Sequence, residues 1–393
     1  MAPSTSATDG GAPNPSIAIG GLGFPLSPSR LTEPLGWRQL STPAPFADVS
    51  RETSPEQRDP DADVSRETAP PVEHEATAPE DELRAAVAAA LPHPDEDTPL
   101  AQAVAEDAVR RITLTGRELP RPAATRVMTV ANQKGGVGKT TTTVNVAAAL
   151  AQAGSTVLVV DLDPQGNAST ALGIPHHAEV PSVYDVIVDA TPVAEVVQPC
   201  PDIDNLLCVP ATIDLAGAEI ELVSLVARES RLSRALAAYI QQRTAAGDPL
   251  DYVLIDCPPS LGLLTVNAFV AAQEVFIPIQ CEYYALEGLS QLLKNIDLIK
   301  THLNPDLAVS TILLTMYDAR TRLSAQVAEE VRTHFPTETL RATVPRSVRI
   351  SEAPSHAQTV MTYDPNSSGA LSYLEAANEM ARRWAARSEG DQA

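Results

Sequence analysis

A glycine-rich segment between a strand and a helix constrains this chain more than any other feature. The apolar run 126–131 predicts a strand, and residues 140–153 predict a helix shortly after it. Residues 132–141 connect the strand to the helix and include the first two residues of the helix. They read NQKGGVGKTT. Glycines let backbone N–H groups converge on an anion, and a helix N-terminus adds partial positive charge. The segment therefore predicts a phosphate-binding loop.

Two lysines flank the glycines of this loop. Lys139 is expected at the β- and γ-phosphates, and the hydroxyl of Thr140 at a Mg²⁺ ion. The ordinary pattern GxxxxGK[ST] needs glycine at position 133, where this chain has Gln133, and Lys134 stands ahead of the glycines instead. The residues expected to bind the nucleotide are Lys134, Gly135, Gly136, Val137, Gly138, Lys139, Thr140 and Thr141.

Apolar runs alternate with helical patterns through the rest of the chain. Continuous apolar strands separated by helices are typical of a doubly wound, mostly parallel sheet with helices on both faces. In such sheets ligands bind beyond the carboxyl ends of the strands. The expected strands are 126–131, 156–161, 206–210, 251–256, 274–279, 309–315 and 340–344, and the expected helices include 140–153, 214–243, 261–272, 286–302 and 322–334.

The first 123 residues have a different composition. They contain 18 of the 34 prolines and no lysine. Such a segment cannot bury enough apolar area to offset its chain entropy, so we expect a disordered N-terminal arm over 1–123. Thr98 and Pro99 resemble a helix start and predict a short helix near 99–113. We expect a globular domain over 124–387 and a disordered tail over 388–393.

The charge balance and the cysteines limit the classes of protein to which this chain can belong. A net charge of −22 argues against a generally basic nucleic-acid coat but leaves room for a local basic patch. The sequence has no run of 18 apolar residues and no basic, then apolar, N-terminal signal. The four cysteines lack CxxC spacing, which favours a reduced, cytoplasmic protein.

The string KGGVGKTT resembles the deviant Walker A motif of the ParA/MinD superfamily of P-loop ATPases. Within it, nearly all of 124–385 resembles the chromosomal ParA (Soj-type) partition ATPases. The sequence departs from that family at Arg322, where asparagine is usual, and at 357–359, where glycine and a basic residue are usual. Matching stretches beyond the nucleotide motifs are 211–229, 280–289 (QCEYYALEGL), 314–323, 345–356 (PRSVRISEAPSH) and 363–374.

The resemblance implies a role for several residues. Lys134 reaches across a dimer interface to the partner's nucleotide, and Asp163 in the segment DLDPQGN positions the attacking water. The implied catalytic residues are thus Lys134, Lys139 and Asp163, and the implied metal site contains Thr140, Asp161 and Asp256. The implied nucleotide contacts include Pro345 and Arg346. We expect Cys257, beside Asp256, to be a small buried side chain and not a redox group.

Arginines near the last two strands form a candidate DNA-binding patch. They could instead be solvated or pair with nearby glutamates, and spacing alone does not separate these alternatives. The resemblance at Arg349, in PRSVRISEAP, favours contacts with DNA phosphates, which carry no sequence information. The candidates are Arg320, Arg322, Arg341, Arg346 and Arg349.

The resemblance implies an ATP-dependent DNA-segregation switch. The expected activity is slow, Mg²⁺-dependent hydrolysis of ATP. An ATP-bound sandwich homodimer binds non-specific double-stranded DNA of the nucleoid, and a centromere-bound ParB-type partner stimulates hydrolysis and release. The alternative is a MinD-like positioning ATPase on a membrane. The acidic end of the chain and the narrow apolar stripe of its last helix make membrane binding the less favoured expectation.

The heptapeptide ADVSRET occurs at 47–53 and again at 62–68, a period of 15 residues. A recent duplication or a peptide motif for a protein partner would explain it. A third explanation is encoded DNA: the family's centromere consensus TGTTTCACGTGAAACA contains GTT-TCA-CGT-GAA-ACA, which translates as Val-Ser-Arg-Glu-Thr. These alternatives stay open, and the codons of the gene separate the third from the other two.

Overall fold

The computed structural model describes residues 99–114 and 118–390, with side chains at 107–114 and 118–385. The segment before residue 99, which holds both ADVSRET copies and most of the expected arm, lies outside the described residues.

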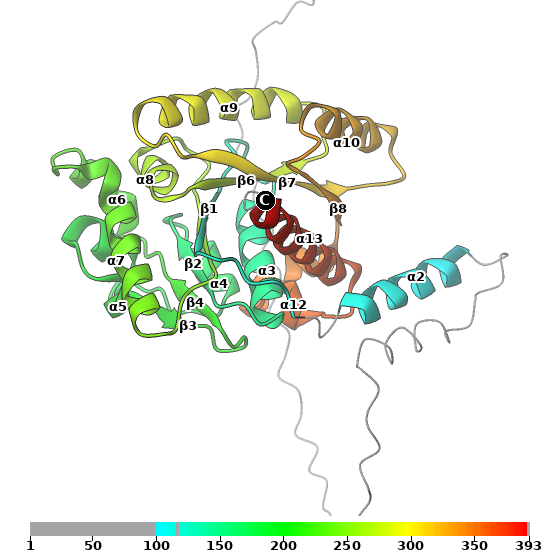
Figure 1. The fold of residues 1–393 in the computed structure, drawn as a ribbon, viewed down its shortest axis with the longest axis horizontal. Helices are drawn as coiled ribbons and strands as arrows, with labels where there is room; N and C mark the ends of the chain where they lie inside the picture. Colours follow the sequence, from blue (N-terminus) through cyan, green and yellow to red (C-terminus); the bar gives the residue numbers. More distant parts are fainter. Residues whose placement is uncertain (1–98, 115–117, 391–393) are drawn as a thin grey trace, which may run out of the picture. The chain divides into compact units, whose positions relative to one another are not determined.

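The described residues form an eight-stranded sheet with the strand order β3-β4-β2-β5-β1-β6-β7-β8 (Figure 1). Neighbouring strands are parallel except β3, a two-residue edge strand antiparallel to β4 and too short to be predicted from the sequence. The doubly wound, mostly parallel sheet expected from the sequence is confirmed. The strands are β1 (Arg126–Val130), β2 (Val157–Asp161), β3 (Gln198–Pro199), β4 (Leu206–Val209), β5 (Tyr252–Asp256), β6 (Glu274–Gln280), β7 (Ala308–Tyr317) and β8 (Thr339–Pro345).

Helices cover both faces of this sheet. Helices α9 and α10 lie over one face, and α3 and α13 lie over the other (Figure 1). The helices are α2 (Pro99–Leu114), α3 (Lys139–Gln152), α4 (Asn167–Ala171), α5 (Val193–Val196), α6 (Leu215–Leu222), α7 (Arg231–Ala245), α8 (Leu263–Ala271), α9 (Ala285–His302), α10 (Arg322–His334), α11 (Val348–Glu352), α12 (Val360–Tyr363) and α13 (Ser368–Gly390), with a π-helix at Asp185–Asp189 and 3₁₀ turns at Arg228–Ser230 and Ala353–His356.

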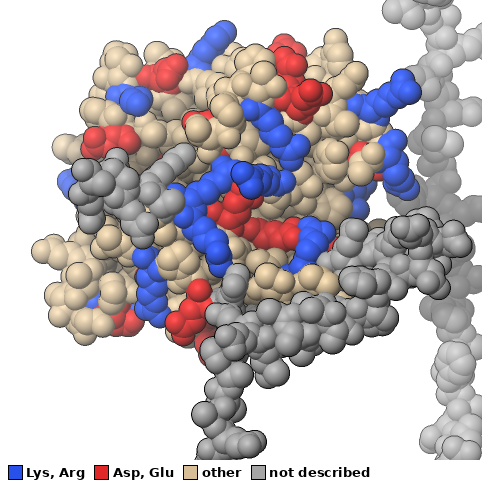
Figure 2. Space-filling view, turned by 45° about the vertical axis from the view of Figure 1, so that its right-hand side comes forward, with Lys and Arg blue, Asp and Glu red and all other residues tan. Residues whose placement is uncertain are grey.

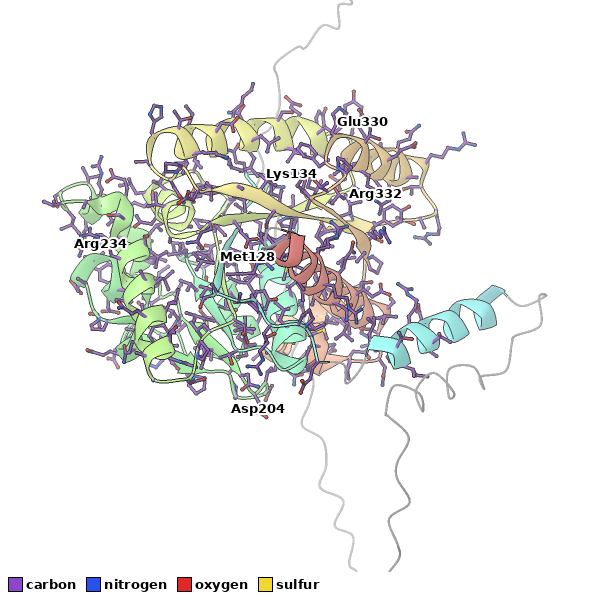
Figure 3. The ribbon with its side chains drawn as sticks, viewed as in Figure 1. Met128, Lys134, Asp204, Arg234, Glu330 and Arg332 are labelled. Atoms are coloured by element: carbon purple, nitrogen blue, oxygen red, sulfur yellow. The ribbon has the colours of Figure 1, made fainter. Side chains whose placement is uncertain are left out.

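Two apolar cores lie on the two faces because side chains alternate along each strand. Val127 of β1 packs in the core that contains Leu289 of α9, whereas Met128 packs in the core that contains Tyr373 of α13. Met128, which is labelled in Figure 3, and Tyr373 are almost completely buried. The central strands are therefore apolar on both faces, which explains why the sequence shows them as continuous apolar runs.

The expectation of one helix over 214–243 is wrong. The chain forms α6, then a turn over 223–230, then α7. Ala227 in this turn has φ +51°, the left-handed conformation that stops a helix. Neither glycine nor proline stands in residues 223–230, so local sequence does not indicate the break.

The described part of the chain begins with helix α2 and ends with helix α13. Helix α2 occupies Pro99–Leu114, where the sequence predicted a short helix. Arg110 contacts Glu375 of α13 through two hydrogen bonds of 2.6 and 2.5 Å, and Arg111 donates to the carbonyls of residues 365–367. At the other end α13 continues to Gly390, past the domain end expected at 387.

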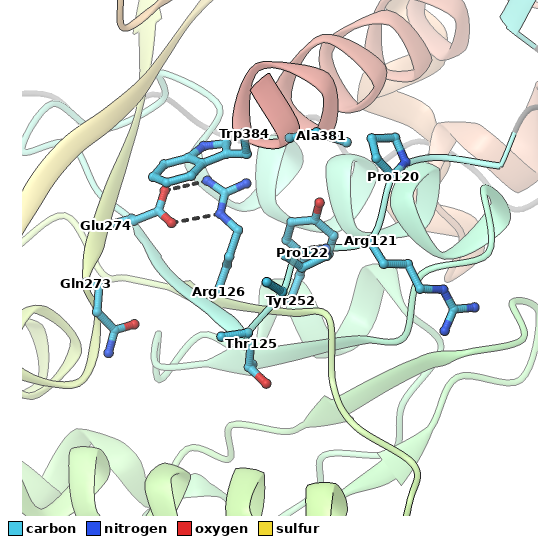
Figure 4. A pocket seen from close by; sticks show the side chains of 13 residues that line it. Pro120, Arg121, Pro122, Thr125, Arg126, Tyr252, Gln273, Glu274, Ala381 and Trp384 are labelled. Carbon is cyan, nitrogen blue, oxygen red and sulfur yellow. Dashed lines mark hydrogen bonds and ion pairs between the residues drawn. The ribbon is translucent and has the colours of Figure 1, made fainter. Parts of the chain in front are cut away.

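The amino edge of the sheet is held by a buried ion pair (Figure 4). Arg126 of β1 donates to both carboxylate oxygens of Glu274 of β6, at 2.8 and 2.5 Å. The indole of Trp384 lies 3.8 Å from the guanidinium carbon of Arg126, so α13 covers the pair. A cavity of about 760 Å³ opens beside it, lined by Pro120, Tyr252 and Trp384 among others.

None of the helices in residues 99–114 and 118–390 is both long and apolar enough to cross a membrane.

Candidate nucleotide site at the carboxyl edge of the sheet

The glycine-rich loop connects β1 to α3 at the carboxyl edge of the sheet. Gly136 and Gly138 have φ +74° and +87°, a conformation that side chains disfavour. The side-chain amide of Asn132 donates to the carbonyl of Pro278 (2.9 Å) and its oxygen accepts from the N–H of Lys134 (3.0 Å). The hydroxyl of Thr315 donates to the carbonyl of Val137 (2.9 Å). The loop is therefore fixed by contacts from β6 and β7.

Lys139 begins α3 and is buried, with 8% of its surface exposed. Burial lowers the pKa of its ammonium group, and the nearby carboxylates of Asp256 and Asp163 oppose that shift. A buried cation at a helix N-terminus is stabilised by an anion placed in the loop. This arrangement is what a phosphate-binding lysine requires.

Two buried carboxylates stand side by side at the ends of β2 and β5. Asp161 and Asp256 are paired in the parallel register, and neither is exposed to solvent. Burial, and then the proximity of Asp161, raises the pKa of Asp256, while the hydroxyls of Thr140 and Thr143 oppose the shift. The hydroxyl of Thr143 donates to Oδ1 of Asp256 at 3.1 Å.

The second carboxylate oxygen of Asp256, Oδ2, shows whether the site fits a metal ion. Oδ2 is buried and has no hydrogen-bond partner among the residues that the structure describes. A buried acceptor without a partner is costly, and a hard cation or its bound water would compensate it. Carboxylate and hydroxyl oxygens are the donors that Mg²⁺ prefers. The residues present therefore fit a magnesium ion.

Asp161 uses its oxygens differently from Asp256. Its Oδ2 accepts from the N–H and the hydroxyl of Ser169, at 2.9 and 2.7 Å, and its Oδ1 accepts from the N–H of Asp163 at 3.2 Å. Asp161 thus fixes the segment that carries Asp163. Asp163 is half-buried, and its Oδ1 accepts from the N–H of Gln165 at 3.0 Å, so the turn holds its carboxylate in place.

The lysine ahead of the glycines points away from the loop toward the segment after β6. Lys134 donates from Nζ to Oε2 of Glu282 at 2.7 Å. The other oxygen of Glu282 accepts from the amide of Gln280 and lies 4.0 Å from Arg346. In this structure Lys134 is therefore bound by a carboxylate of its own chain.

A cavity of about 180 Å³ lies beside the first turn of α3. It brings Pro345 and Arg346, two of the expected nucleotide contacts, next to Gly138 and Thr141. Met316 in its wall has φ +50°, the kind of backbone strain that collects at ligand sites. The other lining residues are Thr315, Val344, Ser347, Ile350, Ser351 and Tyr373.

Four of the five candidate arginines for DNA lie in the segments that follow two neighbouring strand ends. Tyr317 pairs with Pro345 at the ends of β7 and β8, so the loops 318–322 and 346–349 start side by side. Arg341 does not belong with them, because it lies four residues before the end of β8 and its N–H contacts Glu379 of α13. The remaining candidates are Arg320, Arg322, Arg346 and Arg349.

Acidic side chains accompany these arginines. Arg320 pairs with Asp318 at 2.9 Å and lowers the pKa of that carboxyl to about 2. Arg349 lies 3.3 Å from Glu352 and 3.4 Å from Asp364. The face in Figure 2 likewise has basic side chains next to acidic ones.

Several residues at the site had no predicted role. Asn132, Thr315 and Ser169 support the loop and the carboxylates through contacts that only the fold creates. Glu282 lies within the family-like stretch 280–289, which was the one signal available for it. Cys257 is a buried side chain as expected, and burial raises the pKa of its thiol to about 12.

The loop, the buried lysine, the carboxylate pair and the adjoining cavity together define a P-loop nucleotide-binding protein with a second lysine ahead of its glycines. The sequence model of the AAA domain matches residues 125–309. The chain is 53% identical over 256 residues to the sporulation initiation inhibitor protein Soj of Bacillus subtilis, covering 65% of this chain and 98% of that protein. It is 50% identical to the chromosome partitioning protein ParA of Myxococcus xanthus, covering 66% and 88%.

The chain belongs to the Soj/ParA family of chromosome partitioning proteins. Among solved structures it resembles cobyrinic acid a,c-diamide synthase from Mycobacterium smegmatis with bound ATP analogue and magnesium, at 38% identity and a TM-score of 0.56, covering 67% of this chain and 97% of that one.

Proposed function

We propose that this chain is an ATP-dependent switch for DNA segregation. In its ATP-bound form two copies close over their nucleotides and bind nucleoid DNA without sequence preference. A ParB-type protein at the centromere then stimulates hydrolysis, and the chain releases the DNA. This cycle would take place in the cytoplasm, on the nucleoid.

The position of Lys134 carries the proposal. Its ammonium group pairs with Glu282 and does not serve the phosphate loop from which it projects. That loop already has a cation in Lys139, so a second lysine that points away from the loop is available to another nucleotide. A second copy of the chain supplies one, and this supports an active site completed by dimerisation.

The nucleotide is expected to bind along the carboxyl edge. Its phosphates would accept hydrogen bonds from the loop N–H groups and from Lys139, with the base directed into the cavity beside Pro345 and Arg346. A Mg²⁺ ion would be held by Thr140 and, through water, by Asp256, and it would neutralise charge on the phosphates. The free oxygen of Asp256 supports this assignment.

Hydrolysis requires an oriented water. Asp163 is the candidate, because its segment is fixed by Asp161 while its carboxylate stands near Lys139. Asp161 would act mainly by holding this segment, since Ser169 and the N–H of Asp163 already bind its oxygens. Hydrolysis is expected to be slow until a partner copy brings in Lys134.

DNA binding is assigned to the arginines at the ends of β7 and β8. Arg320, Arg322, Arg346 and Arg349 lie in the segments after these two neighbouring strand ends and would contact phosphates. Because acidic residues accompany them, a single copy offers weak attraction. Two copies in one dimer would double the number of phosphate contacts and steepen the salt dependence.

The experiment that tests this function is co-sedimentation of the ATP-bound protein with DNA and, separately, with anionic liposomes. We expect ATP-dependent sedimentation with DNA alone. Sedimentation with liposomes and not with DNA would contradict the proposal and support the MinD-like alternative.

A further inference from the structure

Two adjacent tyrosines stand exposed beside the nucleotide site. Tyr283 and Tyr284 are 75% and 65% exposed, in the turn between β6 and α9. Their rings contact each other edge to face, with centroids 5.1 Å apart and planes at 87°. Large aromatic surfaces left in water are unfavourable, and tyrosine is among the residues that dominate the binding energy of protein interfaces.

The position of this pair follows from the chain itself. Tyr283 comes directly after Glu282, the carboxylate that binds Lys134 at 2.7 Å, and consecutive Cα atoms are about 3.8 Å apart. A surface that presents a nucleotide to Lys134 therefore approaches the turn that carries the two tyrosines.

The surroundings favour a protein over DNA as the occupant. Glu282 keeps 45% of its side chain exposed next to the tyrosines, so the surface around the rings carries a negative charge and is not the purely basic surface that DNA favours. The ring pair is already arranged and each tyrosine has only two side-chain torsions, so ordering it in an interface costs little entropy. A symmetric dimer would use the same pair from both copies.

We propose that Tyr283 and Tyr284 are the aromatic anchor through which two copies of this chain close over their nucleotides. This inference rests on the proposed ATP-dependent dimer and names the side chains that hold it together. Closure covers the ring pair, brings the partner's nucleotide to Lys134, and lets that lysine exchange Glu282 for a phosphate.

The test compares the double variant Tyr283→Ser/Tyr284→Ser with the wild-type chain and with Leu298→Ser. Leu298 is a matched control because it is 58% exposed on α9, outside the site. Dimerisation is measured by analytical ultracentrifugation with Mg²⁺ and a non-hydrolysable ATP analogue. Nucleotide affinity is measured separately with a fluorescent ATP analogue on dilute, monomeric protein, and thermal melting checks that each variant is folded.

We expect the wild type and Leu298→Ser to dimerise alike, and the double variant to dimerise roughly 100-fold more weakly or not at all. Its nucleotide affinity as a monomer should match that of the wild type. The conservative pair Tyr283→Phe/Tyr284→Phe should retain most of the dimer, since the rings are kept.

The outcomes separate this inference from the function on which it rests. A wild-type chain that stays monomeric with the ATP analogue overturns the proposed dimer and the anchor together. A double variant that dimerises like the wild type overturns the anchor alone. A double variant that dimerises normally but no longer sediments with DNA also overturns it, because the tyrosines then belong to a DNA-binding surface.

Discussion

Nζ of Lys134 lies 2.7 Å from Oε2 of Glu282, and this contact joins the loop after β1 to the segment after β6. Both side chains are partly exposed, so the pair is held weakly: such ion pairs contribute at most about 1 kcal/mol. The pair holds Lys134 in a single copy of the chain, but it is weak enough for a phosphate to replace Glu282. We interpret it as a contact that opens when two copies meet.

The first prediction follows from this contact. In Glu282→Gln the competing carboxylate is gone, so Lys134 is free to reach the partner's nucleotide. The dimer should form more tightly, by up to about 30-fold, because each of the two copies releases no more than roughly 1 kcal/mol. Ultracentrifugation over a concentration series with an ATP analogue measures the change, and a dimer weaker than that of the wild type would contradict the interpretation.

The second prediction concerns Asp163. Asp163→Ala should bind ATP normally, accumulate as a dimer, and hydrolyse ATP at least about 100-fold more slowly, because only the orientation of water is lost. Single-turnover kinetics measures the rate of hydrolysis, and light scattering measures the accumulation of the dimer. Hydrolysis at the wild-type rate would show that another residue orients the water.

The third prediction compares two arginines that the sequence grouped together. Arg349→Glu should abolish retention of DNA at moderate salt while ATP-driven dimerisation persists. Arg341→Glu is its control, since Arg341 lies away from the carboxyl edge, and it should bind DNA like the wild type. Each phosphate contact adds roughly −0.9 to the slope of log affinity against log salt. Salt-independent binding, or equal loss in both variants, would remove the assigned patch.

The fourth prediction is a pH dependence of stability without nucleotide. Burial, then Asp161, raises the pKa of Asp256 to about 8, so the folded chain binds this proton more strongly than the unfolded chain does. The resulting stability is complete below the unfolded value near 4 and is lost as pH rises through about 8. Asp256→Asn removes this contribution.

Urea unfolding between pH 5 and pH 8 measures the effect. The free energy of unfolding of the wild type should fall with pH more steeply than that of Asp256→Asn, by up to about 1.4 kcal/mol per pH unit. Carboxylates remote from Asp256 affect both proteins equally and cancel in the difference, whereas Asp161 does not cancel, because its charge acts on Asp256. Parallel curves for the two proteins would refute the assignment of a protonated Asp256.

The parts of the site that the sequence predicted are those formed by neighbours in the chain. Lys139 and Thr140 follow the glycines directly, and Asp161 and Asp256 end apolar strands, so local pattern was enough. Asn132 and Thr315 could not be found this way, because their partners are brought near only by the order of the strands.

Contacts and conformations that depend on the whole fold could not be predicted from local sequence. Glu282 is 148 residues from Lys134 in the chain, and no spacing indicates that they touch. The break between α6 and α7 depends on Ala227 adopting a left-handed conformation, which an alanine does not signal. The sequence groups Arg341 with the DNA candidates, whereas the structure places it within β8, four residues before the carboxyl edge.

The central claim is that Lys134 acts on the nucleotide of a second copy. The direct measurement is ATP hydrolysis and sedimentation of Lys134→Ala beside the wild type, with Mg²⁺ and saturating ATP. Because the loop and Lys139 are intact, the variant should bind ATP with wild-type affinity but remain monomeric and fail to hydrolyse it. A strictly monomeric Lys134→Ala protein that hydrolyses ATP at the wild-type rate would contradict the account.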